Sequence, residues 1–199
     1  MSQTDNHGRI GPNAIIRVFE ALNEQRGRTV AEAVFNRAGL EAYLDALPEA
    51  MVPEQEVIAL QQALRDELGI AEAREIARDA GRRTGDYLLA RRIPRPAQAL
   101  LKILPAKLAS RTLLKAISGN AWTFVGTGHF AVTSENPPRI EITHSPLCRG
   151  TMADEPLCDF YAGTFERLFR VLVHPDTVFT ETACQAMGDP SCLFEGRWS

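Results

Sequence analysis

The sequence predicts an α+β protein in which N-terminal helices lead into a small antiparallel sheet with one packed helix. Before residue 120, apolar residues recur at helical spacing, and prolines and glycines separate the segments. After Gly119 the apolar positions are rich in aromatic and β-branched residues, which is typical of strands. The 199 residues are 45% hydrophobic and 24% charged, an ordinary globular composition that excludes a disordered chain or a collagen-like repeat.

Proline and glycine positions indicate where the helices begin and end. Pro12 occupies a first-turn position ahead of an apolar stripe. Thr29 and Glu32 have the spacing of a capping box, so we expect a second helix to begin there. Pro53 opens a further helix that Gly69 ends. Three more helices are expected over residues 71–91, 97–104 and 107–117.

The C-terminal part is expected to form two pairs of strands around one helix. A strand within residues 121–133 is followed by an Asn136–Pro138 turn and by Arg139–Thr143, which alternates with period two. Pro156–Val173 has a wide apolar face and is the expected packed helix. The segments of the closing hairpin are Val178–Ala183 and Cys192–Phe194.

Composition also limits the compartment and the partners. No apolar run approaches the roughly 18–20 residues that span a bilayer, and the polar N-terminus lacks the apolar region of a secretory signal. We therefore expect a cytoplasmic protein, whose four cysteines are thiols or metal ligands more often than disulfides. The net charge of −3 argues against a protein built mainly to bind nucleic acid.

Positive charge is concentrated in one segment. From Arg74 to Lys115 there are eleven Lys and Arg residues against three acids, which leaves the rest of the chain at −11. One interpretation is a set of solvated helix faces. The other is a basic surface for an anionic ligand, an acidic partner or a membrane surface, densest at Arg91, Arg92 and Arg95.

The most specific pattern is a group of cysteines in the last quarter of the chain. Cys158 lies near the start of the last helix, and Glu181, Cys184 and Cys192 lie in the closing hairpin. Three thiolates and one carboxylate suit tetrahedral Zn²⁺. Glu181 and Cys184 are three residues apart and face opposite sides of a regular strand, so this site requires the strand to bend or end between them. Buried free cysteines or a Cys184–Cys192 disulfide remain alternatives.

These motifs carry a family resemblance. The segment resembles the 4-vinyl reductase domain, which is also found in phenol-sensing transcription activators and is related in fold to TRAPP subunits and haem–nitric-oxide-binding domains. The resemblance covers residues 70–199 and leaves 1–69 as a helical N-terminal region. The matching motifs are Ser145–Pro146, Cys158, Tyr161–Gly163, Glu181–Cys184, Gly188–Pro190 and Cys192–Phe194.

The resemblance implies a zinc site and a biosynthetic role. Phenol sensors of this family bind zinc through three cysteines and a glutamate, which implies a structural Zn²⁺ at Cys158, Glu181, Cys184 and Cys192. Cys148 has no counterpart in that pattern and is expected to be a core or surface thiol. With its N-terminal helices, the whole chain resembles the BchJ family of bacteriochlorophyll biosynthesis, which is named for reduction of a vinyl group on a tetrapyrrole.

The function expected from this resemblance is that of a tetrapyrrole-binding accessory protein. It would present divinyl Mg-porphyrin or protochlorophyllide intermediates to pathway enzymes at the vinyl-reduction stage. A flat ring needs apolar walls and a ligand for its central Mg²⁺, and imidazole is a natural ligand for such metals. The candidate walls are Trp122, Phe124 and Phe130, and the candidate ligands are His129 and His144. Ordinary core or surface roles are the alternative for each of the five.

Two other functions stay open. A genuine 8-vinyl (4-vinyl) reductase needs an external reductant, and no catalytic residue is identified for it. The run Gly126-Thr-Gly-His-Phe-Ala131 fits G-x-G-x-x-A but is expected to continue as a strand, which is atypical of a dinucleotide site. The third function is a zinc-stabilised ligand-sensing or assembly module. Because relatives of this fold often pair, we expect a homodimer.

Overall fold

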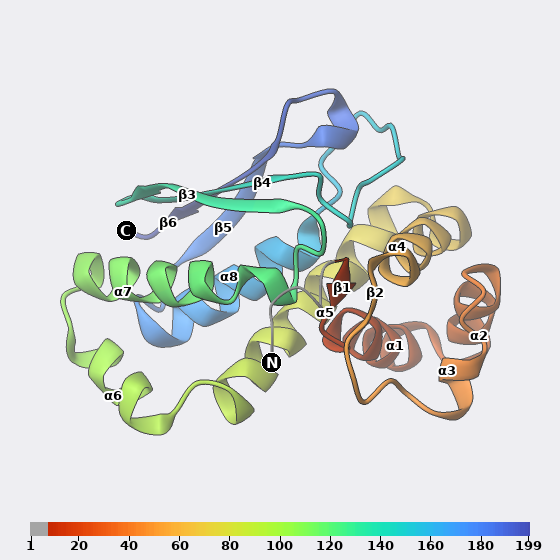
Figure 1. Ribbon diagram of the computed structural model, residues 1–199, viewed down its shortest axis with the longest axis horizontal. Helices are drawn as coiled ribbons and strands as arrows, with labels where there is room; N and C mark the ends of the chain where they lie inside the picture. Colours follow the sequence, from red (N-terminus) through yellow and green to blue (C-terminus); the bar gives the residue numbers. More distant parts are fainter. Residues whose placement is uncertain (1–7) are drawn as a thin grey trace.

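A computed structural model describes residues 8–199 and confirms the α+β architecture (Figure 1). Most of the polar N-terminal segment lies outside the described residues. The helices are α1 (Asn13–Arg26), α2 (Arg28–Arg37), α3 (Ala42–Asp45), α4 (Glu54–Leu68), α5 (Ile70–Arg91), α6 (Arg95–Ile103), α7 (Ala106–Gly119) and α8 (Asp159–Leu172). The strands are β1 (Arg9–Ile10), β2 (Val52–Pro53), β3 (His129–Glu135), β4 (Pro138–Thr143), β5 (Val178–Ala183) and β6 (Cys192–Arg197).

The helix boundaries follow the prolines and glycines, with one correction. Pro53 precedes α4 and Gly69 follows it with a φ of 77°, as the sequence predicts. The predicted capping box is wrong: Gly27 is the N-cap of α2, and no side chain caps this helix end. Thr29 therefore lies inside the first turn, because Gly27, with a φ of 83°, ends α1 and starts α2 immediately.

The main sheet has the strand order β3-β4-β6-β5, and all neighbouring strands are antiparallel. The strand expected within residues 121–133 begins only at His129. Ala121–Thr123 forms a 3-10 turn, and Gly126 has a φ of 60° that an extended strand does not allow. Gly128 then packs so closely on the carbonyl oxygens of Thr143 and His144 that a Cβ there would clash. This turn delays the strand.

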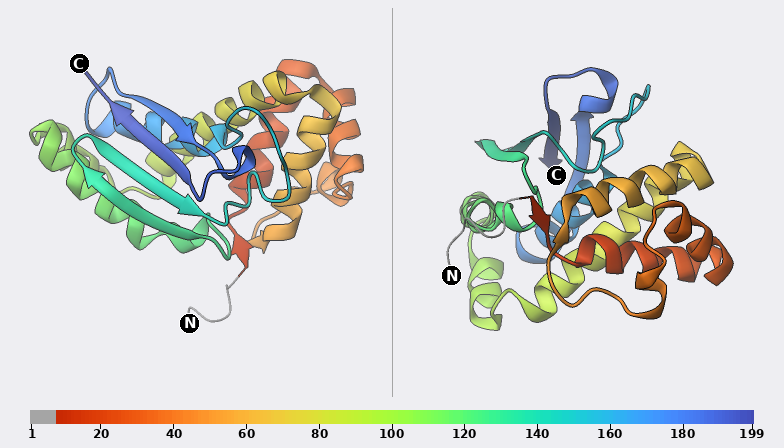
Figure 2. Two further views of the ribbon diagram at one scale, coloured as in Figure 1. Left: turned by 90° about the horizontal axis from the view of Figure 1, so that it is seen from above. Right: turned by 45° about the vertical axis from the view of Figure 1, so that its right-hand side comes forward.

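All the helices lie on one side of the main sheet (Figures 1 and 2). Next to the sheet, α8 packs on β5 and α7 on β3, and α5 lies along α8. Glycines allow the close α5–α8 approach, since a Cβ at Gly81 would overlap the Phe160 carbonyl and one at Gly163 would overlap the Arg78 carbonyl. The N-terminal region is therefore attached to the sheet mainly through α5.

One hydrophobic core runs through the described chain. The predicted division after Gly69 falls between α4 and α5, and α1 packs on α5 while α2 packs on α4. The two-residue strands β1 and β2 pair with each other beside these helices. Within residues 8–199, no helix combines the length and the apolar character needed to cross a membrane.

Candidate functional site

Four buried cysteines meet at one end of the sheet. The sulfur atoms of Cys148, Cys158, Cys184 and Cys192 all lie within 4.8 Å of one another, and none of the four is in a disulfide. Cys192 is the centre of the group, with its Sγ 3.6 Å from the Sγ of Cys148, 3.6 Å from that of Cys158 and 3.9 Å from that of Cys184. The predicted Cys184–Cys192 disulfide alternative is therefore not formed.

Four different local structures supply these thiols. Cys148 lies in the loop between β4 and α8, and Cys158 is the N-cap residue of α8. β5 ends at Ala183, with an irregular register between Glu181 and Ala183, so Cys184 leaves the strand. This confirms the predicted end of the strand between Glu181 and Cys184. Cys192 is the first residue of β6.

The geometry fits a tetrahedral thiolate site. Zn–S bonds of about 2.3 Å place the sulfurs of a four-thiolate shell about 3.8 Å apart, close to the three separations around Cys192. The amide N–H of Gln185 donates to Cys192 Sγ at 3.5 Å, and the Ser145 hydroxyl lies 3.4 Å from Cys158 Sγ. Such outer contacts orient metal-binding side chains. Four buried thiols with these neighbours can hold a metal ion.

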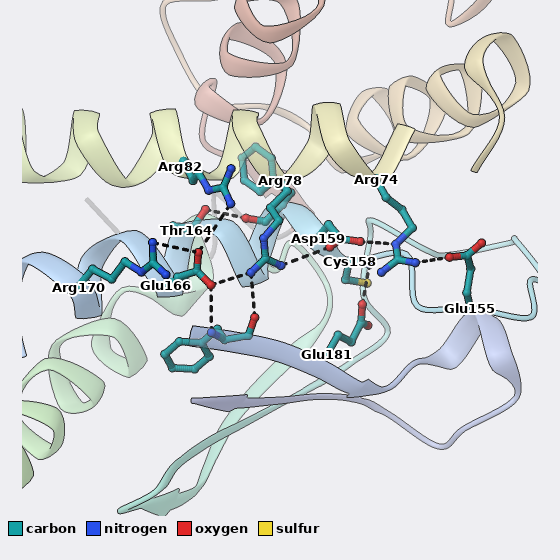
Figure 3. A network of polar contacts seen from close by, with 12 residues as sticks. Arg74, Arg78, Arg82, Glu155, Cys158, Asp159, Thr164, Glu166, Arg170 and Glu181 are labelled. Atoms are coloured by element: carbon teal, nitrogen blue, oxygen red, sulfur yellow. Dashed lines mark hydrogen bonds and ion pairs between the residues drawn. The ribbon is translucent and has the colours of Figure 1, made fainter. Parts of the chain in front are cut away.

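Glu181 lies beside this cluster and makes a different contact (Figure 3). Its Oε2 accepts a hydrogen bond of 2.7 Å from the backbone N–H of Cys158, at the start of α8. Its Oε1 is buried and has no hydrogen-bond partner among the described residues. Burial raises the pKa of the Glu181 carboxyl to about 9. The structure thus groups Cys148 with the three predicted cysteines and places Glu181 next to Cys158.

Sequence reasoning missed Cys148. The loop from Ser145 to Leu157 has no helical or strand periodicity, so nothing in the pattern indicated its path. The available signal was the cysteine content itself: every cysteine of the chain lies within the last 52 residues.

A buried arginine from the N-terminal helices holds the Cys148 loop. Arg65 of α4 donates from Nη1 to the Leu147 carbonyl at 3.0 Å and from Nη2 to the Thr151 hydroxyl at 2.9 Å. Burial lowers the pKa of Arg65, and the nearby Cys158 and Cys148 oppose that shift. The region before Gly69 therefore supports the cysteine cluster directly.

A network of charged side chains connects α5 to α8 and β5 (Figure 3). Arg74 pairs with Asp159 at 2.7 Å and also with Glu155. Arg78 pairs with Glu166 at 2.7 Å and donates to the Phe179 carbonyl of β5 at 3.0 Å. Since Asp159 follows Cys158 directly, this network fixes the start of α8 and with it one thiol of the cluster.

The five predicted ring-binding residues do not line one cavity. Phe124 and Phe130 pack edge to face at 5.7 Å, and Phe130 is buried. Trp122, His129 and His144 are exposed. None of the five lines either of the two best-defined depressions of residues 8–199, which lie around Trp198 and between α4, α5 and Leu157.

The two predicted histidines nevertheless share one end of the sheet. His129 starts β3 opposite Thr143, the residue before His144. The partner strand β6 begins at Cys192, opposite Ile142, so this is also the end with the cysteines. His144 has a φ of 53°, and its carbonyl accepts a hydrogen bond from Arg149.

The glycine turn before β3 is held by a buried carboxylate. Glu54 accepts hydrogen bonds from the Thr127 N–H at 2.8 Å and the Thr127 hydroxyl at 2.7 Å, and it pairs with Arg149 at 2.9 Å. Gly126 and Gly128 lead into β3 and not into a helix. This segment therefore lacks the strand–turn–helix form of a dinucleotide site.

Comparisons with known proteins agree with this architecture. Residues 138–197 match the vinyl-4-reductase domain family. The chain is 44% identical over 188 residues to the bacteriochlorophyll synthase 23 kDa chain of Cereibacter sphaeroides, covering 94% of this chain and 89% of that protein. The protein of the same name from Rhodobacter capsulatus is 40% identical over 190 residues, covering 96% and 87%.

A solved structure supports the fold alone. An H-NOX protein from K. algicida superposes with a TM-score of 0.60 at 10% sequence identity, covering 94% of this chain and 96% of that one. The sequence relatives establish the kinship. The chain belongs to the family of the bacteriochlorophyll synthase 23 kDa chains, and its C-terminal part is a vinyl-4-reductase domain.

Proposed function

We propose that this protein is an accessory factor of bacteriochlorophyll biosynthesis that binds magnesium-tetrapyrrole intermediates and presents them to enzymes of the pathway. The observation that carries this proposal is the kinship with two bacteriochlorophyll synthase 23 kDa chains over 94% and 96% of the sequence. The likeness spans the N-terminal helices as well as the vinyl-4-reductase domain, so the proposal concerns the whole chain.

The end of the sheet that carries His129 and His144 is the proposed ring site. Both imidazoles are exposed there, and an exposed imidazole can bind the central Mg²⁺ of a ring lying on the surface. Trp122, on the turn before β3, offers an exposed apolar surface. Phe124 and Phe130 have a supporting role in this proposal, since they pack beneath this segment.

Residues of this chain favour binding over hydride transfer. The one glycine pattern that resembles a dinucleotide motif is occupied by its own contacts, with Thr127 bound to Glu54 and Gly128 packed on β4. A reductase function remains the alternative and requires an external reductant. The two functions differ in what happens when a reductant is added to the complex.

An absorbance and fluorescence titration with protochlorophyllide, without reductant, tests the ring site. We expect saturable binding with a shifted Soret band, and at least about tenfold weaker binding by the His129→Ala/His144→Ala double variant. His174→Ala is the matched control, because His174 stacks on Trp198 at the opposite end of the sheet. Absence of saturable binding at micromolar concentration contradicts the proposal. Reduction of a divinyl substrate on adding reduced nicotinamide supports the reductase instead.

We further propose that the four cysteines hold a structural Zn²⁺. Four thiolates close a tetrahedral shell and leave no position for substrate, and Zn²⁺ favours such ligands. In this proposal Cys148 is the fourth ligand, and Glu181 orients Cys158 through its backbone N–H. The zinc ties the Cys148 loop, the start of α8 and the closing hairpin together.

Two variants separate this ligand set from the one that the family resemblance implies. Glu181→Gln keeps an oxygen for the Cys158 N–H, so we expect it to retain one zinc per protein. Cys148→Ser should lose most of the zinc and one thiolate's share of the charge-transfer absorbance of the Co²⁺-substituted protein. The reverse result, with zinc lost from Glu181→Gln and kept by Cys148→Ser, would assign the fourth position to Glu181. Absence of zinc from the purified wild-type protein and from zinc-supplemented refolding contradicts the metal site.

A further inference from the structure

The hairpin of α6 and α7 exposes large apolar side chains. Leu100 is 54% exposed, Ile103 80% and Leu108 51%. On α6, Pro96, Leu100 and Ile103 follow the i, i+4, i+7 spacing of one helical stripe. Leu101 is the buried residue of this helix, so the stripe faces away from the core. Such a cluster of exposed aliphatic residues indicates a binding surface.

Unpaired cations surround this stripe. The chain has no Asp or Glu between Asp86 and Glu135. Only Arg111 of this stretch forms an ion pair within residues 8–199, with Glu135 at 3.2 Å. The exposed Lys and Arg residues without an ion-pair partner in that part of the structure are Arg91, Arg92, Arg95, Lys102, Lys107 and Lys115.

Carboxylates on the neighbouring elements are engaged elsewhere. α6 packs on α7 and α8, whose acids Asp159 and Glu166 pair with the arginines of α5. Asp86, near the end of α5, pairs with Arg167 at 2.7 Å. The positive charge of the α6–α7 surface is therefore not neutralised by the elements packed against it.

We propose that this α6–α7 surface docks on an anionic lipid bilayer. Its aliphatic side chains would enter the boundary between headgroups and acyl chains, and the surrounding Lys and Arg would contact lipid phosphates. Lysine side chains suit this position because their stems lie along apolar surface while the ammonium reaches water. The hairpin forms a projecting edge of the molecule, remote from α2 and α3 (Figures 1 and 2), so it can reach a flat surface unhindered.

The residue types favour lipid over an acidic protein. Protein interfaces are depleted in Lys and enriched in aromatic residues. Here Lys102 and Lys107 flank aliphatic Leu100, Ile103 and Leu108. Lys and Arg beside an exposed aliphatic stripe are instead typical of helices that lie on a membrane interface.

Flotation with lipid vesicles tests the proposal. We expect the full-length protein to bind vesicles of phosphatidylcholine with about 30 mol% phosphatidylglycerol, and to bind pure phosphatidylcholine at least about tenfold more weakly. Lys102→Glu/Lys107→Glu should lose at least about tenfold in affinity at about 0.1 M salt. Leu100→Ser/Ile103→Ser should lose binding at low and high salt alike, because it removes the apolar contact.

Arg28→Glu/Arg37→Glu is the matched control. It changes the net charge by the same amount on exposed positions of α2, remote from α6. We expect it to bind like the wild type, and thermal melting shows whether each variant is folded. Failure of the folded wild type to bind anionic vesicles overturns the proposal, whether or not it binds an acidic protein. Equal losses in the control and in Lys102→Glu/Lys107→Glu also overturn it.

Discussion

Two adjoining parts of the chain contain similar basic residues and use them differently. Four arginines of α5 pair with carboxylates of α1, α8 or their own helix, and they lie in a core-side interface. The cations from Arg91 to Lys107 have no ion-pair partner in the described chain and surround exposed Leu100, Ile103 and Leu108.

The difference shows that charge density along a sequence does not determine its use. The sequence interval Arg74–Lys115 is a single basic segment, and its interpretation as solvated or binding surface was open. The structure divides it near Arg91. In the first part, spatial neighbours supply the acids that the local sequence lacks, and in the second part the packed neighbours supply almost none. Only the second part has charge left over for recognition.

Loss of a cysteine ligand should destabilise the paired region most. For Cys184→Ser we expect loss of bound zinc together with a drop of more than about 4 kcal/mol in the free energy of unfolding, since loss of a structural metal is among the few changes this large. Thermal and denaturant unfolding with parallel zinc analysis measures both.

Val178→Thr, on an exposed position of the same strand β5, is the control and should retain zinc. A Cys184→Ser protein without zinc but with an unchanged melting temperature would exclude a structural role for the metal.

Removal of Arg78 should have the next largest effect. Arg78→Met leaves the buried Glu166 carboxylate without its closest cation and the Phe179 carbonyl without its side-chain donor. We expect a loss of about 3 kcal/mol, the lower end for a broken buried pair, because Arg82 and Arg170 stay within 4.0 Å of Glu166. Urea unfolding measures it.

Arg83→Met on the same helix provides the comparison. Its partners Asp79 and Glu24 are partly or largely exposed, so the change should be at most about 1 kcal/mol. Equal losses in the two variants would show that the Arg78 network has no special part in joining α5 to α8.

The sequence predicted local features well and spatial neighbours poorly. Pro53, Gly69 and the long helix from α5 were correct because proline and glycine act on the backbone where they stand. The end of β5 before Cys184 was also correct, since it followed from the alternation of a strand. The late start of β3 was missed, because aromatic residues at 122 and 124 resemble a strand until the glycine turn is seen.

For the candidate site, the missing information was the path of a loop. Three cysteines belong to a helix start and a hairpin, which their own periodicity places. Cys148 reaches the cluster only through a loop that Arg65 fixes from 82 residues away in sequence. Contacts of this kind depend on the assembled core and have no local signal.

Glycine at the α5–α8 crossing offers a smaller test of the paired region. A Cβ at Gly163 would overlap the Arg78 carbonyl, so Gly163→Ala must push the two helices apart. We expect a loss of about 2 kcal/mol from overpacking, measured by thermal unfolding. Gly119→Ala is the control, because nothing lies near a Cβ at that position. Equal stability of the two variants would mean that the helices separate without loss.

The smallest change in stability should come from the unpaired region. Arg91→Ala/Arg92→Ala removes two exposed cations without an ion-pair partner in the described chain, so we expect the free energy of unfolding to stay within about 0.5 kcal/mol of the wild type. The same variant should bind anionic vesicles more weakly. Stability and binding thus respond in opposite ways in the two parts of the basic segment, with Arg78→Met lowering the first and Arg91→Ala/Arg92→Ala the second. A stability loss above about 1 kcal/mol in the latter would place Arg91 and Arg92 with the structural arginines.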